Sequence, residues 1–181
     1  MQRFKNLPNI ITMIRLFLVP AIVAMITGGR WVEAFVVFLL AGLSDALDGW
    51  LAKRFSLQTE LGAYLDPVAD KMLLVSIYVA LAITGAVPAW LTILVVSRDI
   101  MIIGAILISW VLDKPVRVAP LFVSKVNTAV QLVFATWVLA ERAFGWPSDG
   151  ILSSLAVATV AALTLASAAA YLGPWIKHMG R

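Results

Sequence analysis

The chain has 181 residues, of which 62% are hydrophobic and 13% are charged, and its formal net charge is +4. Soluble domains are close to half apolar and carry about a quarter charged residues, so this composition indicates a membrane protein. There is no cysteine and only one histidine, His178, close to the C-terminus. Disulfides and cysteine-ligated zinc or iron–sulfur sites are therefore excluded, and carboxylates remain as the plausible metal ligands.

Six apolar segments follow one another, each close to the roughly 20 residues that a membrane-spanning helix needs. They lie at 10–27, 32–53, 63–84, 88–112, 122–143 and 150–172. The runs are continuous rather than alternating with a period of two, which argues against a β-barrel. We predict an all-α, polytopic membrane fold with six transmembrane helices in one bundle, forming a single domain over residues 1–181. The first segment is expected to be retained, because Arg15 interrupts its apolar run and no small-residue cleavage site follows.

The basic residues predict the orientation, because lysine and arginine are enriched on the cytoplasmic side of membrane proteins. With the N-terminus inside, only Arg30 and Arg142 fall outside. The inner side holds Arg3, Lys5, Lys53, Arg54, Lys114, Arg117, Lys125, Lys177 and Arg181. We therefore predict an integral membrane protein with both termini cytoplasmic. Short loops and the absence of a targeting segment favour the bacterial inner (cytoplasmic) membrane, although a mitochondrial enzyme without its transit peptide would look similar. The basic residues are scattered, which suits anionic lipid headgroups and argues against nucleic-acid binding.

Four of the ten acidic residues lie close together, toward the end of the second segment and the start of the third: Asp45, Asp48, Asp66 and Asp70. An ionised carboxylate in a bilayer is costly unless it faces water, a partner or a metal. Spacings of three and four residues place each pair on one face of a helix. Two such faces together offer the oxygen ligands that Mg²⁺ or Mn²⁺ prefers. The sequence therefore predicts a metal-dependent active site at the cytoplasmic ends of the second and third helices.

Small and cationic residues accompany these aspartates. Gly49, Ala52 and Gly62 leave room for a ligand to approach the backbone, while Lys53 and Arg54 supply positive charge. Metal ligands, small residues and cations at one place are what a diphosphate ester needs.

The spacing also supports a resemblance. The stretch Asp45-x2-Asp48-Gly49-x2-Ala52-Lys53-x8-Gly62-x3-Asp66-x3-Asp70 closely resembles the signature of the CDP-alcohol phosphotransferase family, membrane enzymes that make phospholipids. Seven of its eight constrained positions agree; the eighth is usually arginine and here is Lys53, which keeps the charge but loses the bidentate fork. Leu7-Pro8-Asn9-x2-Thr12-x2-Arg15 looks like the family's N-terminal element.

The resemblance implies a core of six transmembrane helices, usually a homodimer, and two divalent metal ions, Mg²⁺ or Mn²⁺. It implies that Asp45, Asp48, Asp66 and Asp70 hold these metals around the CDP diphosphate, and that Asp70 is the general base. The CDP site that it implies consists of Asn9, Thr12, Asp45, Gly49, Ala52, Lys53, Gly62 and Asp66.

The segments SRDIMIIGAI and SKVNTAVQL look most like the cardiolipin synthase branch of this family. That branch transfers the phosphatidyl group of CDP-diacylglycerol to phosphatidylglycerol, giving cardiolipin and CMP. The alternative is the phosphatidylglycerophosphate synthase branch, whose acceptor is glycerol 3-phosphate. Candidate acceptor-binding residues are Arg98, Arg117 and Lys125. Arg98 could instead form a structural ion pair with another helix, and the other two could reflect topology alone.

A different class of protein also carries intramembrane aspartates, namely ion or proton-coupled transporters. Those proteins place the acids near the bilayer midplane on broken helices. Here the acids gather at the inner ends of two helices, and no paired glycine- or proline-interrupted segments occur. We therefore favour the enzyme over the transporter and over a purely structural membrane protein.

Overall fold

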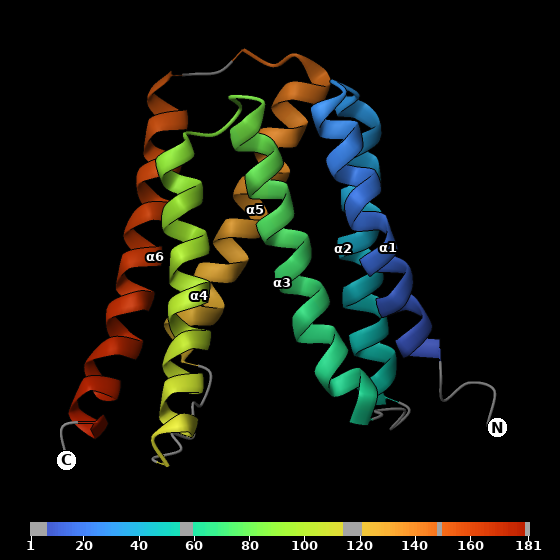
Figure 1. Ribbon diagram of the computed structural model, residues 1–181. Helices are drawn as coiled ribbons and strands as arrows, with labels where there is room; N and C mark the ends of the chain where they lie inside the picture. The colour runs from blue at the N-terminus through green and yellow to red at the C-terminus, as the bar shows by residue number, and fades with distance from the viewer. Residues whose placement is uncertain (1–6, 55–59, 114–120, 148–149, 180–181) are drawn as a thin grey trace. The chain divides into compact units, whose positions relative to one another are not determined.

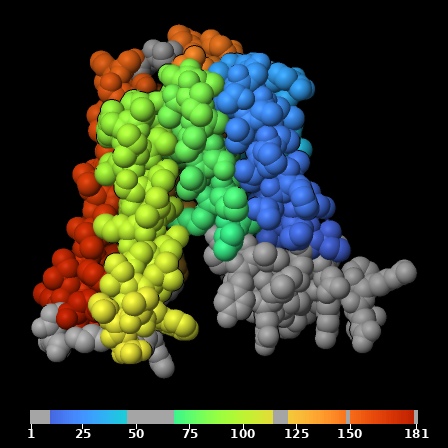
Figure 2. Space-filling view, in the orientation of Figure 1, coloured from blue at the N-terminus to red at the C-terminus, as the bar shows by residue number. Residues whose placement is uncertain are grey.

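The computed structural model describes residues 7–54, 60–113, 121–147 and 150–179 (Figure 1). The side chains of residues 7–9, 46–54 and 60–67 also lie outside the described part and are grey in Figure 2. All regular secondary structure in the described residues is helical. In chain order the helices are α1 (Leu7–Thr27), α2 (Trp31–Arg54), α3 (Glu60–Ile83), α4 (Ala89–Val111), α5 (Phe122–Phe144) and α6 (Gly150–Met179).

Over the residues that the structure describes, the prediction of an all-α fold with six helices is therefore confirmed. Over the described residues, four stretches are long and apolar enough to cross a membrane: Ile10–Thr27, Ala89–Val111, Phe122–Phe144 and Gly150–Met179. These helices also expose much of their apolar surface. On α4, which is green to yellow in Figure 2, Trp110 is 75% exposed and Val111 is 82% exposed. Large exposed apolar surfaces of this kind suit contact with lipid. Membrane crossing by α2 and α3 stays a prediction, as do the six-span bundle and its cytoplasmic active site.

Glycines end the helices where the sequence pattern predicts breaks. Gly29 after α1 and Gly85 after α3 have φ values of 73° and 69°, a left-handed conformation that residues with a side chain rarely adopt. The turn after α1 closes with a 2.8 Å hydrogen bond from the Arg30 N–H to the Met25 carbonyl. Such bonds satisfy the carbonyl groups that a helix leaves unpaired at its C-terminus.

The chain divides into two compact units, which we describe separately. Unit 1 comprises Met1–Val87 and Ala135–Trp146. In this unit α1 packs against both α2 and α3. Its core contains fully buried apolar side chains from each of the three helices, including Ile22, Phe38 and Leu81. The close packing of α1 on two neighbours decides which polar side chains of α1 can reach α2 and α3.

Unit 2 comprises Pro88–Phe134 and Pro147–Arg181. Within it α4 packs against α6. The contact includes the Trp175 indole N–H, which lies 2.8 Å from the Ser109 hydroxyl and 3.0 Å from the Ala105 carbonyl. A buried indole N–H normally finds such a partner, and here the bond ties the C-terminal part of α6 to α4.

Candidate functional site

Arg15 of α1 brings together one aspartate from α2 and one from α3. Its Nη1 atom lies 2.5 Å from Oδ1 of Asp45 and 2.6 Å from Oδ1 of Asp70. Nη1 of a guanidinium carries two N–H groups, so a single nitrogen can donate to both carboxylates. The first and last aspartates of the predicted motif therefore meet, although 25 positions separate them in the sequence.

The local sequence explains why Arg15 points this way. Arg15 and Thr12 are three residues apart on α1, so they share a helix face, and both are buried, at 1% and 2% exposure. This face is the one that meets α2 and α3, because α1 packs on both. A charged group placed there must find opposite charge, since a buried and unpaired guanidinium costs several kcal/mol.

The two carboxylates are much more open than the guanidinium that joins them. The side chain of Asp45 is 41% exposed and that of Asp70 is 49% exposed, whereas that of Arg15 is 1% exposed. Arg15 therefore reaches them from the interior of unit 1, and their other sides remain accessible. An ionised carboxylate has about four lone-pair sites on its two oxygens, so a bond to Arg15 leaves capacity for another ligand.

This arrangement fits the metal chemistry that the sequence predicts. Oxygens from two helices lie within 2.6 Å of one cationic nitrogen, so they are close enough together to share a small cation. Hard carboxylate oxygens are the donors that Mg²⁺ and Mn²⁺ prefer. Asp48 lies on α2 with Asp45, and Asp66 lies on α3 with Asp70, so both pairs have the predicted helical spacing.

The other predicted members of the site are only partly described. The side chains of Asp48 and Asp66 lie outside the described part, as do those of the remaining predicted CDP-binding residues apart from Thr12 and Asp45: Asn9, Gly49, Ala52, Lys53 and Gly62. Arg117 lies outside it entirely. Their roles stay predictions.

Comparison with known proteins decides the family. Residues 5–170 match the family model described as CDP-alcohol phosphatidyltransferase. The chain belongs to that family. Members use a CDP-alcohol donor and a lipid or glycerol phosphate acceptor, and they generally use divalent metals. The resemblance that the aspartate motif supports is thereby confirmed.

Relatives in the CDP-alcohol phosphatidyltransferase family include proteins named cardiolipin synthase and proteins named phosphatidylglycerophosphate synthase. A human cardiolipin synthase (CMP-forming) is 36% identical over 192 residues, which cover 97% of this chain and 62% of the relative. The rat protein of the same name is 35% identical with the same coverage. A probable phosphatidylglycerophosphate synthase of Mycobacterium tuberculosis is 32% identical over 187 residues, which cover 98% of this chain and 85% of the relative. The chain thus spans about 62% of the length of the two mammalian proteins.

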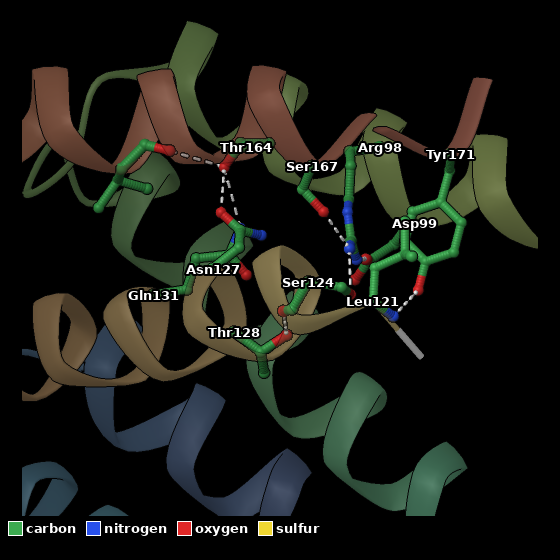
Figure 3. A network of polar contacts seen from close by, with 11 residues as sticks. Arg98, Asp99, Leu121, Ser124, Asn127, Thr128, Gln131, Thr164, Ser167 and Tyr171 are labelled. Carbon is green, nitrogen blue, oxygen red and sulfur yellow. Dashed lines mark hydrogen bonds and ion pairs between the residues drawn. The ribbon is translucent and has the colours of Figure 1, made fainter. Parts of the chain in front are cut away.

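Arg98, a predicted acceptor-binding residue in this family member, lies in unit 2 at the centre of a polar network (Figure 3). Its Nη1 lies 2.6 Å from Oδ1 of Asp99, and its Nη2 donates to the hydroxyls of Ser124 and Ser167. The guanidinium also lies 5.8 Å from the centre of the Tyr171 ring. Arg98 is 4% exposed, so α4, α5 and α6 all contribute to the surroundings of one buried cation. The sequence raised an ion pair for Arg98 as an alternative, and it forms with the next residue rather than with another helix.

Lys125 is exposed on α5, one residue after Ser124. A second group of buried polar side chains lies further along the same helix. Thr164 of α6 accepts a hydrogen bond from Nε2 of Gln131 at 3.1 Å and lies 3.0 Å from Oδ1 of Asn127. Asn127 and Gln131 are not among the predicted site residues, although amides in an apolar helix usually mark a contact with another helix.

Removing the partner of a buried cation should destabilise unit 2. Asp99→Leu leaves the Arg98 guanidinium without its ion pair, and breaking a buried pair typically costs about 3–5 kcal/mol. We expect a clear fall in the melting temperature of the detergent-solubilised protein. The double variant Arg98→Met/Asp99→Leu should recover most of the loss, whereas Arg30→Gln, which breaks the exposed pair with Glu33, should change little. Equal melting of Asp99→Leu and the wild type would contradict this account.

Proposed function

We propose that this chain transfers the phosphatidyl group from CDP-diacylglycerol to a hydroxyl of phosphatidylglycerol, giving cardiolipin and CMP. The observation that carries the proposal is the meeting of Asp45 and Asp70 at Arg15, which joins the two halves of the family motif in space. The choice of acceptor is supported by the segments SRDIMIIGAI and SKVNTAVQL and by the mammalian relatives named cardiolipin synthase.

The alternative acceptor is glycerol 3-phosphate, which would make the chain a phosphatidylglycerophosphate synthase. The Mycobacterium tuberculosis relative named for that activity supports it, because the match covers 85% of that protein. The two reactions share the donor, the leaving group and the aspartate motif. They differ in whether the acceptor is a lipid or a small water-soluble phosphate.

In the proposed mechanism Asp70 is the general base. Its carboxylate is half-exposed, so an acceptor hydroxyl can approach it, and the bond from Arg15 fixes its position. The carboxylate takes the proton of the hydroxyl while the hydroxyl oxygen attacks the phosphorus that carries diacylglycerol. The bond from that phosphorus to the oxygen of the CMP phosphate then breaks, and CMP leaves. A positioned base of this kind contributes about 10²–10⁴-fold to the rate.

The residues proposed to hold two divalent ions are Asp45, Asp48, Asp66 and Asp70. When bound, the metals supply positive charge that neutralises the diphosphate oxygens and the leaving group. The proposed CDP contacts are Asn9, Thr12, Asp45, Gly49, Ala52, Lys53, Gly62 and Asp66. Among them Thr12 lies one helical turn from Arg15, which is consistent with a place beside the aspartates.

We propose Arg98, Arg117 and Lys125 as acceptor-binding residues. Lys125 is exposed and can meet a phosphate directly. Arg98 is buried and paired with Asp99, so its part in acceptor binding would be indirect: it would position the surrounding residues of α5 and α6. We also propose that the protein is a homodimer in the bacterial inner membrane, with both termini and the site on the cytoplasmic side, where water-soluble CMP can leave.

The decisive experiment is CMP release by purified protein with CDP-diacylglycerol and Mg²⁺ or Mn²⁺, with phosphatidylglycerol and glycerol 3-phosphate offered in parallel. Release with phosphatidylglycerol alone, together with a four-chain lipid product, would support the cardiolipin assignment. Release with glycerol 3-phosphate alone would move the assignment to the alternative. No release with either acceptor would overturn both.

A further inference from the structure

Arg15 is buried, whereas the two carboxylates that it joins are open to their surroundings. It is 1% exposed, while the two carboxylates that it joins are 41% and 49% exposed. It belongs to α1, whereas the motif aspartates belong to α2 and α3. Arg15 therefore contacts the two carboxylates from the buried side, and it belongs to a helix that contributes none of the four aspartates.

A cation in this position could act in one of two opposite ways toward a metal. It could compete, by occupying the carboxylates until a metal displaces it. It could instead cooperate, by holding the carboxylates in place while a metal binds on their open side. The two possibilities predict opposite effects of its removal on metal affinity, so they can be separated by one measurement.

Burial favours the second possibility. Displacement by a metal would break two ion pairs of the buried Arg15 guanidinium, and breaking a buried ion pair costs several kcal/mol. The contacts also use Oδ1 of each aspartate and reach it from the interior side. Carboxylates have capacity for further ligands on their accessible side, so metal binding does not require that Arg15 leave.

The two carboxylates also need a group that holds them near each other. They come from different helices and carry like charges, so at the separation that Arg15 enforces they repel each other. A cationic nitrogen within 2.6 Å of an oxygen of each carboxylate offsets this repulsion and fixes their orientation before a metal arrives. Outer partners of this kind orient metal ligands, and their loss typically weakens metal affinity or activity about 10–100-fold.

We propose that Arg15 is a positioning residue that assembles Asp45 and Asp70 into a metal-binding pair. This inference rests on the proposed function, because it takes the two aspartates as metal ligands. Through Arg15, α1 would set the relative position of the metal ligands on α2 and α3.

The test is a Mn²⁺ titration of the detergent-solubilised full chain, freed of metal beforehand, with free and bound Mn²⁺ measured by electron paramagnetic resonance. Arg15→Met has a similar length but no charge, and we expect Mn²⁺ affinity about 10–100-fold below the wild type. The Mn²⁺ affinity of Arg15→Lys should lie between those of the wild type and Arg15→Met, because lysine keeps the positive charge but lacks the planar guanidinium. Arg142→Met is the matched control in the same unit; Arg142 lies over the Trp31 ring, and its loss should leave the affinity unchanged.

Unchanged or tighter Mn²⁺ binding by folded Arg15→Met would overturn the inference, and tighter binding would identify Arg15 as a competitor. Thermal melting establishes which variants are folded. If Arg15→Met is not, Arg15→Lys decides, and affinity equal to or above the wild type overturns the inference. Failure of the wild type itself to bind Mn²⁺ would overturn the proposed metal site and this inference together. Failure of the inference alone would instead appear as Mn²⁺ binding by the wild type that the Arg15 variants do not weaken.

Discussion

Asp70→Asn should reduce turnover by at least about 100-fold, because an amide cannot accept the proton of the acceptor hydroxyl. The substitution keeps the size of the side chain and an oxygen that can accept the bond from Arg15, so the packing of α1 on α3 should persist. Binding of the CDP-lipid should stay measurable. The measurement is CMP release at saturating donor, together with donor binding to the same preparation.

Asp113→Asn is the matched control for this experiment. Asp113 follows α4 in unit 2 with a φ of 52°, a conformation that aspartate and asparagine both tolerate. The control should therefore retain both folding and turnover. Normal turnover in Asp70→Asn would remove Asp70 as the base and leave it, at most, as a metal ligand.

Removal of divalent metal should abolish the reaction, and added Mg²⁺ or Mn²⁺ should restore it. Without metal, the negatively charged carboxylates proposed as ligands would lie close to the negatively charged diphosphate of the donor, which is strongly unfavourable. The experiment dialyses the protein against EDTA and follows CMP release as metal is returned.

EDTA already saturated with Mg²⁺ is the control, since it adds the chelator without removing metal. Melting curves before and after dialysis separate loss of metal from loss of fold. Full activity after exhaustive chelation would contradict the metal requirement, even if the variants of Asp70 were inactive.

Much of the helical architecture could be predicted from the sequence, because long apolar runs separated by glycine, proline and charge leave few alternatives. The expected second segment, 32–53, corresponds closely to α2 (Trp31–Arg54). The largest difference is at the end of α6, expected at 172 and found at Met179. The helix continues past the expected end and includes Pro174. Proline removes one backbone hydrogen bond, and packing such as that of Trp175 on α4 can offset this loss.

The aspartates of the site and Arg98 could be singled out from the sequence, but their partners could not, and Arg15 was not among the predicted site residues. Arg15 interrupts an apolar run, and a buried arginine requires a carboxylate, so a pairing with one of the clustered aspartates was within reach. Which of the aspartates it meets depends on how α1 rotates and packs, and helical spacing does not determine that. The same limit applies to Arg98, whose hydroxyl partners Ser124 and Ser167 come from two other helices.

The buried amides of α5 have a consequence for biogenesis. Asn127 and Gln131 are 0% and 1% exposed, and both lie within hydrogen-bonding distance of Thr164 of α6. During synthesis α5 leaves the ribosome first, at a time when lipid offers its amides no hydrogen-bonding partner. α5 is also the least apolar of the four candidate spans, so alone it is a poor substrate for insertion. The translocon should therefore release α5 and α6 into the bilayer together, as a helical hairpin in which Thr164 of α6 is the hydrogen-bonding partner of the two amides of α5.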